Sequence, residues 1–254
     1  MAKKINERKK NRIKLKQEKN SNEEDNTDQT RKQSNFSPKV VLERTEANFT
    51  YKDYEFEVKR KMFHIVLGFG VVALFYFNIF DASRLFLLIL FGLITCTLAK
   101  YYKIPGIQHM LDEFERKENL KRLPGKSVIY FLAGALLAIV IFPKDIAVAS
   151  LLILTIGDGI SPIIGMSYGR IKHPFSNIKF IEGSIAGTAL SIIGIMLFVY
   201  WGYINISFLE AFLASFAAMF FEGIEWQLHR DLQDDNIIIP LVSGGVIYLV
   251  RYLM

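Results

Sequence analysis

The sequence predicts an all-α integral membrane protein that has about seven transmembrane helices and a disordered, basic N-terminal tail. Three observations lead to this prediction. Of the 254 residues, 51% are hydrophobic, and they are concentrated after residue 58. There they form blocks near the ~20 apolar residues that an α-helix needs to cross a bilayer. Residues 1–58 are strongly polar instead, so we expect a tail over 1–58 and a polytopic membrane domain over 59–254.

Basic residues dominate the start of the tail. Residues 1–19 contain nine Lys or Arg and two Glu, without the apolar stretch of a signal peptide behind them. Such a segment can lie on an anionic cytoplasmic leaflet, or it can be solvated and disordered. We expect no nucleic-acid binding from it. The single cysteine, Cys96, excludes a disulfide within the chain and zinc sites built from cysteine pairs.

Seven apolar blocks give the predicted membrane spans. Several are short, so tilt or local thinning of the bilayer must accommodate them. The predicted spans are residues 62–80, 84–99, 127–142, 146–168, 184–203, 208–222 and 237–254.

The distribution of Lys and Arg predicts the orientation of these spans. Basic residues precede the first span and fill the loops after the second and fourth, whereas the opposite connections carry only Arg84 and Lys144. The N-terminus is therefore expected in the cytoplasm. We expect an amphipathic interfacial helix in 107–126, the loop 169–184 and the segment 222–236 on the same side.

The segment GDGISPIIGMSYGR, residues 157–170, places Asp158 inside an apolar run. A carboxylate in hydrocarbon costs at least a few kcal/mol unless it is paired, and a metal ion or a lysine is the expected partner. Gly157 and Gly159 on either side permit irregular backbone, which is tolerated where it lines a protein cavity. Gly165 and Gly169 form a small-xxx-small pair, whose ordinary role is close helix packing.

The segment IKFIEGSIAGTALS, residues 178–191, marks a transition from loop to helix. Free backbone N–H groups at a helix N-terminus, here next to Gly183 and Ser184, suit a phosphate group. Glu182 can hold Mg²⁺ together with phosphate oxygens, or it can simply offset the helix dipole. The dipole alone does not explain the basic residues that gather between the two carboxylate-bearing helices, which are Arg170, Lys172 and Lys179.

Two further polar residues lie at the ends of spans. His64 follows Arg60 by four residues on one face of the first span, where a structural hydrogen bond is the more common role. Asp235 and Asn236 precede the last span and can cap its helix. The chain has no GxxxxGK[ST], HExxH, CxxC or GxSxG motif. Carboxylates, basic residues and helix N-termini beside a membrane suit phosphoryl or nucleotidyl transfer on a lipid, because such transfer is mostly positioning and charge neutralisation.

Five segments in order resemble the membrane lipid kinases that use CTP, a family that includes dolichol (polyprenol) kinase, phytol kinase and CTP-dependent diacylglycerol kinase. These segments are KRKMFHIVLG, ENLKRLPGKSVIYFLAG, GDGISPIIGMSYGR, IKFIEGSIAG and DDNIIIPLVSG, spread over residues 59–245.

The resemblance implies which residues bind CTP. One matching element contains Asp158, Gly165, Gly169 and Arg170, and the other contains Lys179, Glu182 and Gly183. The chain departs from the family pattern at two positions. Ser161 replaces the usual Ala, and Phe180 replaces a hydroxyl residue, which removes one possible phosphate contact.

We therefore expect a CTP-dependent kinase that phosphorylates the hydroxyl of a membrane lipid alcohol, such as a polyprenol, a phytol-like isoprenoid or diacylglycerol. Mg²⁺ would be held by Asp158 and Glu182. Charge would be neutralised by Lys179, Arg170 and Lys172, and the hydroxyl would be oriented or deprotonated by Asp235, Glu222 or His64.

The expected enzyme is a multi-pass membrane protein with its active site on the cytoplasmic face, and it can act as a homodimer. Two other functions stay open at this point. One is a CTP-dependent lipid cytidylyltransferase, although the acidic segment with Asp231, Asp234 and Asp235 suits a neutral alcohol better than a lipid phosphate. The other is a transporter with Asp158 as an ion site, although the sequence shows no internal repeat.

Overall fold

The computed structural model describes residues 51–253, except 103–104, 117–118, 121–122, 177 and 225–234. The described residues belong to one compact unit. The described part is helical, with one isolated β-bridge between Lys172 and Phe180. The helices are α3 (Tyr51–Tyr76), α4 (Ala82–Tyr101), α5 (Pro105–Phe114), α7 (Lys126–Ile141), α8 (Lys144–Leu152), the π-helix η1 (Ile153–Asp158), α9 (Gly159–Tyr168), α10 (Ile181–Tyr200), α11 (Phe208–Glu222) and α12 (Asp235–Leu253).

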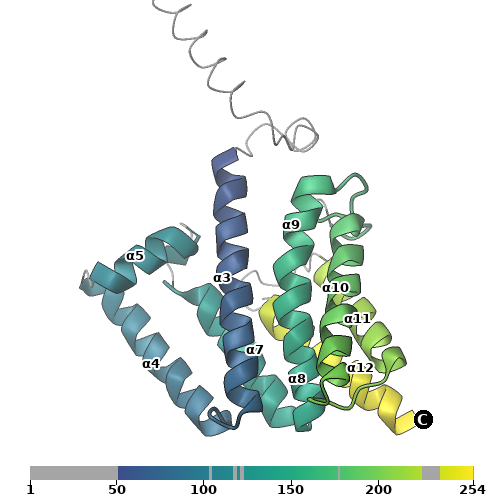
Figure 1. The fold of residues 1–254 in the computed structure, drawn as a ribbon. Helices are drawn as coiled ribbons and strands as arrows, with labels where there is room; N and C mark the ends of the chain where they lie inside the picture. The colour runs from purple at the N-terminus through teal and green to yellow at the C-terminus, as the bar shows by residue number, and fades with distance from the viewer. Residues whose placement is uncertain are drawn as a thin grey trace, which may run out of the picture. The chain divides into compact units, whose positions relative to one another are not determined.

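Each predicted span coincides with a helix or with a run of helices (Figure 1). Four segments among the described residues are long and apolar enough to cross a membrane: Ala82–Ala99, Lys144–Tyr168, Ile181–Tyr200 and Asp235–Leu253. Helix α7 is apolar but shorter. The all-helical membrane class is thus supported, whereas the number of spans stays a prediction.

The first helix begins earlier than the sequence suggested. Residues 51–58, which we assigned to the tail, form the first two turns of α3 together with the adjoining residues. Charged residues are frequent in 51–58, so the composition of this stretch resembles that of the tail before it. Asp53 in the first turn nevertheless favours the start of a helix there. The rest of the predicted tail, residues 1–50, lies outside the described residues.

The run α8–η1–α9 is the centre of the fold. In its most apolar segment, 83% of the residues are buried inside the protein, compared with 6% in the corresponding segment of α4. Helices α3, α7, α10, α11 and α12 all pack against parts of this run. The segment that carries Asp158 is therefore enclosed by protein, whereas α4 presents a row of large apolar side chains outward.

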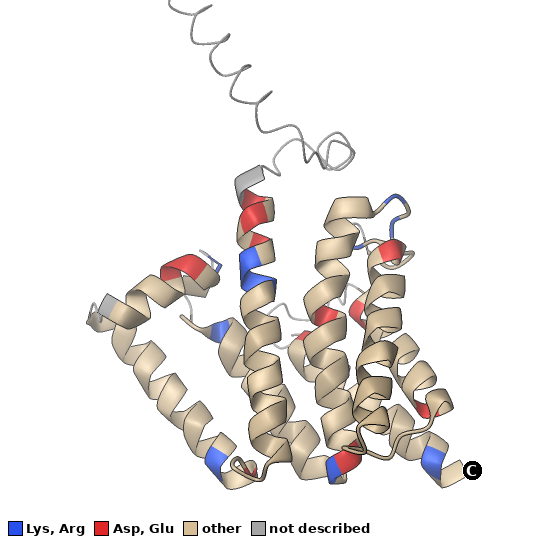
Figure 2. Ribbon diagram, viewed as in Figure 1, with Lys and Arg blue, Asp and Glu red and all other residues tan. Residues whose placement is uncertain are grey.

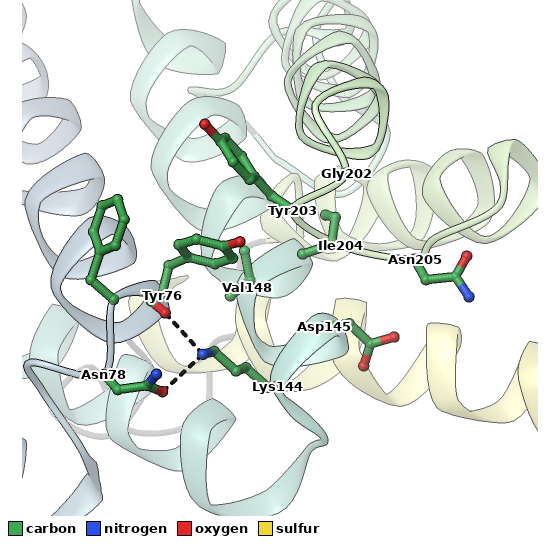
Figure 3. Close-up of a pocket in the computed structure, with 10 residues that line it drawn as sticks. Tyr76, Asn78, Lys144, Asp145, Val148, Gly202, Tyr203, Ile204 and Asn205 are labelled. Atoms are coloured by element: carbon green, nitrogen blue, oxygen red, sulfur yellow. Dashed lines mark hydrogen bonds between the residues drawn. The ribbon is translucent and has the colours of Figure 1, made fainter.

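Many charged residues lie toward the two ends of the helices, and further acidic residues lie part-way along the bundle (Figure 2). At the end where α8 begins, Lys144 Nζ donates to Tyr76 O and Asn78 Oδ1, both at 2.8 Å. These residues line an open pocket of about 740 Å³ (Figure 3). Arg251 joins Asp145 at 2.7 Å at this end, which ties α12 to the start of α8.

Helices α9 and α10 approach so closely that their facing glycines cannot be replaced freely. A Cβ on Gly183 would collide with Ser161 O and lie 3.2 Å from Gly165 Cα. A Cβ on Gly187 would lie 3.0 Å from Gly157 O. The glycines at this contact thus allow backbone to meet backbone, as small-xxx-small patterns do.

We expect Gly183→Ala to lower the midpoint of thermal unfolding in detergent by roughly 3–10 °C, because overpacking costs about 1–3 kcal/mol. Gly245→Ala on α12 is the matched control, since a Cβ there has no neighbour within 4 Å. Equal midpoints for the two variants would contradict the close packing of α9 on α10.

Candidate active site

Asp158 ends the π-helical turn, and only 2% of the residue is exposed. The prediction of irregular backbone at this carboxylate is confirmed, and π-turns inside helices are frequent at functional sites. Lys61 Nζ on α3 donates to both carboxylate oxygens of Asp158 at 2.8 Å. Of the two partners that the sequence allowed, the structure shows a lysine, and this lysine is itself only 6% exposed.

His64 lies one turn along α3 from Lys61 and faces the same carboxylate. Its Nε2 is 3.4 Å from Asp158 Oδ2, and its ring meets Phe131 edge-on at 4.5 Å between centroids. Within the described part of the chain this Nε2 has no hydrogen-bond partner. The structural hydrogen bond that we considered for His64 is therefore not made by Nε2.

Lys179 joins two further carboxylates. Its Nζ donates to Asp235 Oδ2 at 2.8 Å, lies 3.2 Å from Glu222 Oε1 and also donates to Glu222 O. Burial by itself lowers the pKa of Lys179, but the carboxylates of Glu222 and Asp235 outweigh burial and hold it above its usual range. Lys179 is therefore a protonated, positively charged group at neutral pH.

The loop between α9 and α10 positions Lys179. His173 N donates to Lys179 O at 2.9 Å, and Ile181 N donates to Ile171 O at 3.0 Å. Ser176 Oγ accepts from Lys179 N at 2.9 Å. These bonds close the loop onto itself, so the backbone at Lys179 is held on both sides.

Three carboxylates converge between these cations. One oxygen from each of Asp158, Glu222 and Asp235 lies within 4.8 Å of the other two. Ser161 Oγ also donates to Glu222 Oε2 at 3.1 Å, so the residue that departs from the family pattern contacts this cluster. We call Asp158, Glu222, Asp235, Lys61 and Lys179 the carboxylate–lysine cluster.

The donor set of the cluster suits a hard cation. Mg²⁺ prefers oxygen ligands and is commonly held by one or two carboxylates together with substrate phosphates. Asp158, Glu222 and Asp235 supply carboxylate oxygens that lie close enough together to contribute to one site. The residues present therefore fit Mg²⁺.

Glu182 does not belong to this group of carboxylates. Its side chain accepts from Arg170 N at 2.8 Å and from Ile171 N at 3.1 Å, which ties the loop to the start of α10. The structure therefore does not bring Glu182 into the group around Asp158, whereas Glu222 and Asp235 lie close to it. Spacing along the chain did not reveal this, because Glu222 and Asp235 come from other helices.

The remaining predicted binding residues lie around the same loop. Arg170 and Lys172 are exposed, and Ser184 is half-buried in the first turn of α10. A Cβ on Gly169 would collide with the Phe180 ring, and one on Gly165 would contact Phe180 at 3.7 Å. These two glycines make room for Phe180, which stands where the family pattern has a hydroxyl residue.

Sequence reasoning missed Lys61 and undervalued Glu222. Lys61 was counted only as part of the basic residues before the first span. Its spacing of three from His64 places both on one helix face, and this was the available signal. Glu222 was considered for orienting a hydroxyl but not for binding a metal ion. Glu225, His229, Arg230, Asp231 and Asp234 lie outside the described residues.

The protein is thus a helical protein with segments apolar and long enough to span a membrane, and it buries a carboxylate–lysine cluster among its helices. Comparison with known proteins narrows this description. The chain is 28% identical over 208 residues to a probable chloroplastic phytol kinase of Triticum aestivum, covering 76% of this chain and 67% of that protein. It is 26% identical over 222 residues to CTP-dependent diacylglycerol kinase 1 of Eremothecium gossypii, covering 74% and 65%.

An uncharacterised protein of Rickettsia prowazekii is 30% identical over 197 residues, which cover 75% of this chain and 92% of that protein. No family model matches the chain. No solved structure matches it either. The chain is thus similar to membrane lipid kinases, among them phytol kinases and CTP-dependent diacylglycerol kinases.

Proposed function

We propose that this protein transfers the γ-phosphoryl group of CTP to the hydroxyl of a membrane-embedded lipid alcohol. The observation that carries the proposal is the carboxylate–lysine cluster, which gathers Asp158, Glu222 and Asp235 with Lys61 and Lys179. Phosphoryl transfer needs such a site, because its catalysis is mostly positioning and electrostatic stabilisation. CTP as the donor is supported by the diacylglycerol kinases of the family, whose names state CTP dependence.

In the proposed reaction the lipid hydroxyl oxygen forms a bond to the γ-phosphorus. The bond from that phosphorus to the oxygen bridging the β- and γ-phosphates breaks, and CDP leaves with the electron pair. The hydroxyl proton passes to a basic group of the site, for which Asp235 and His64 are the candidates. Lys179 neutralises negative charge that develops on the phosphate oxygens.

Mg²⁺ would be held by Asp158, Glu222 and Asp235, and when bound it would neutralise phosphate charge. In this proposal Glu182 does not bind the metal ion but positions the loop. By accepting from Arg170 N and Ile171 N it fixes the loop that carries Lys179. The exposed Arg170 and Lys172 and the half-buried Ser184 provide a polar surface for the nucleotide phosphates.

We further propose that residues 59–254 form a domain of seven spans with the cluster on the cytoplasmic side and the N-terminus in the cytoplasm. The excess of basic residues in the loops at the cluster end supports this orientation. In this arrangement CTP would bind from the cytoplasm, and the lipid acceptor would approach through the bilayer.

The product distinguishes a kinase from a cytidylyltransferase. With purified protein, Mg²⁺ and a panel of polyprenol, phytol and diacylglycerol, label from [γ-³²P]CTP is expected in the lipid. Label from [α-³²P]CTP is expected in CDP, because the α-phosphate stays with the nucleoside. Mass spectrometry should find a lipid monophosphate.

A CDP-lipid, or release of pyrophosphate with a lipid phosphate as acceptor, would overturn the kinase assignment. Competition with unlabelled ATP is the control for the donor. If ATP suppresses label transfer as well as unlabelled CTP does, the preference for CTP is contradicted while the kinase assignment stands.

A further inference from the structure

A narrow cavity lies on the α4 and α5 side of the carboxylate–lysine cluster. Its volume is about 180 Å³, and its walls come from α3, α4, α5 and the start of α7. Most of its lining is apolar, and Phe63, Leu67, Met110, Phe114 and Val128 contribute to it. The rings of Phe63 and Phe114 stack at 4.7 Å between centroids, so this wall is built by contact between α3 and α5.

Helix α4, which contributes Cys96 to the cavity wall, presents large apolar side chains outward. It packs against α7 and diverges from α3, and α5 lies between the diverging ends of α3 and α4 (Figure 1). Phe91 and Ile94 on α4 are more than half exposed, as expected for side chains that contact lipid tails. An apolar chain that left the cavity along α4 would therefore meet side chains suited to contact with lipid.

Part of the cavity wall is polar and contains Arg60, His64, Glu115 and Ser127. Arg60 is paired with Glu57 at 2.7 Å, and Ser127 Oγ donates to Glu115 Oε1 at 2.9 Å, so these groups have partners. His64 also lines the cavity and is only 8% exposed, and its Nε2 has no hydrogen-bond partner among the described residues. A buried polar atom without a partner costs free energy. A ligand hydroxyl would recover this free energy if the imidazole turned its buried Nε2 toward the cavity.

His64 connects the cavity to the cluster. The same imidazole that lines the cavity has its Nε2 3.4 Å from Asp158 Oδ2. A hydroxyl at the part of the cavity wall formed by His64 would thus be separated from Asp158 by this imidazole alone. Reaction between two bound groups requires a separation near 3–3.5 Å, so the acceptor site must lie next to the cluster, as this cavity does.

We propose that this cavity binds the hydroxyl-bearing end of the lipid acceptor, with the hydroxyl next to His64 and the apolar chain leaving between α3 and α4. The role of the bound alcohol as phosphate acceptor rests on the proposed kinase function, whereas binding of the alcohol in the cavity does not. The cavity is smaller than the roughly 300–1,000 Å³ of pockets that enclose whole small molecules. It would therefore hold the end of the chain while the rest stays in the bilayer.

Narrowing the cavity should weaken acceptor binding selectively. We expect Val128→Phe to raise the KM for the lipid alcohol by about tenfold or more, since even one excess methylene in an apolar pocket has effects of about 10–200-fold. The KM for CTP should stay within about twofold of the wild-type value, because Val128 is not part of the cluster. Val66→Phe on α3 is the matched control, since Val66 is 68% exposed and does not line the cavity.

A binding experiment without CTP tests the site independently of turnover and of any folding defect in the variant. The wild-type protein is irradiated with an isoprenoid alcohol or a diacylglycerol that carries a diazirine close to its hydroxyl. At least one probe should label peptides containing Met110 or Val128, and excess unlabelled alcohol should suppress this labelling.

The outcomes separate the two proposals. Labelling confined to other helices, or no labelling in either arm, would overturn the cavity assignment even if lipid phosphate is formed from CTP. Labelling at the cavity without any transfer from CTP would leave the acceptor site standing and overturn the kinase function. Equal effects of Val128→Phe and Val66→Phe on the acceptor KM would also count against the cavity.

Discussion

Replacement of Asp158 by asparagine is expected to lower kcat/KM for CTP by roughly 10³-fold, because the loss of one preorganised charged group costs about 10²–10³-fold or more. The amide keeps the shape of the carboxylate but removes the charge that faces Lys61, Glu222 and Asp235. The cluster then has one oxygen ligand fewer for Mg²⁺. Transfer of label from [γ-³²P]CTP to a lipid alcohol measures the effect.

The same substitution has a structural effect that must be separated from the catalytic one. Lys61 is 6% exposed and bonded to both oxygens of Asp158, so Asp158→Asn leaves a buried ammonium without its counter-ion. Breaking a buried ion pair in this way costs about 3–5 kcal/mol. The double variant Lys61→Met, Asp158→Asn removes both charges and is expected to recover most of the lost thermal stability, but not the activity.

Glu210→Gln is the matched control for Asp158→Asn. Glu210 is also a buried carboxylate, but it pairs with Arg251 at 2.8 Å and caps α11 at the opposite end of the helices. Its variant should keep turnover per folded molecule. If the double variant of Lys61 and Asp158 is stable and turns over at the wild-type rate, Asp158 is structural and the site assignment fails.

Replacement of Lys179 by methionine is expected to lower kcat/KM by roughly 10²–10³-fold. Lys179 Nζ lies within 3.2 Å of both Glu222 and Asp235, and these carboxylates keep it protonated. Without it, two carboxylates near each other lose their common cation, and phosphate oxygens lose a positive neighbour. Steady-state kinetics with varied CTP measure the loss.

Lys144→Met is the control for Lys179→Met. Lys144 is bonded to Tyr76 O and Asn78 Oδ1 in the pocket at the other end of the helices (Figure 3). Its variant should retain the wild-type kcat/KM in folded protein. Lys179→Arg retains the charge, so it should retain more activity than Lys179→Met. Equal activity of these two variants would show that the charge at this position does not matter for the reaction.

Local patterns in the sequence predict the helices and single out several residues that the structure brings together in the carboxylate–lysine cluster. Apolar blocks located the helices because transmembrane and buried helices need long apolar stretches, and the predicted sixth span has the bounds of α11. The cost of a carboxylate in an apolar run singled out Asp158. Glycines on both sides of it predicted irregular backbone, and the π-turn ends at this residue. These inferences depend on properties of neighbouring residues, which a sequence displays directly.

Which side chains of the carboxylate–lysine cluster contact one another depends on how the helices pack. Lys61 and Asp158 are 97 residues apart, Lys179 and Glu222 are 43 apart, and Lys179 and Asp235 are 56 apart. Glu182 followed Lys179 closely in the sequence and was expected at the metal site, yet its carboxylate holds the loop backbone instead. Periodicity along one helix gives the face on which a residue lies but not the helix that this face contacts. That contact depends on close approaches such as Gly183 against Ser161, and these exist only once the helices are packed.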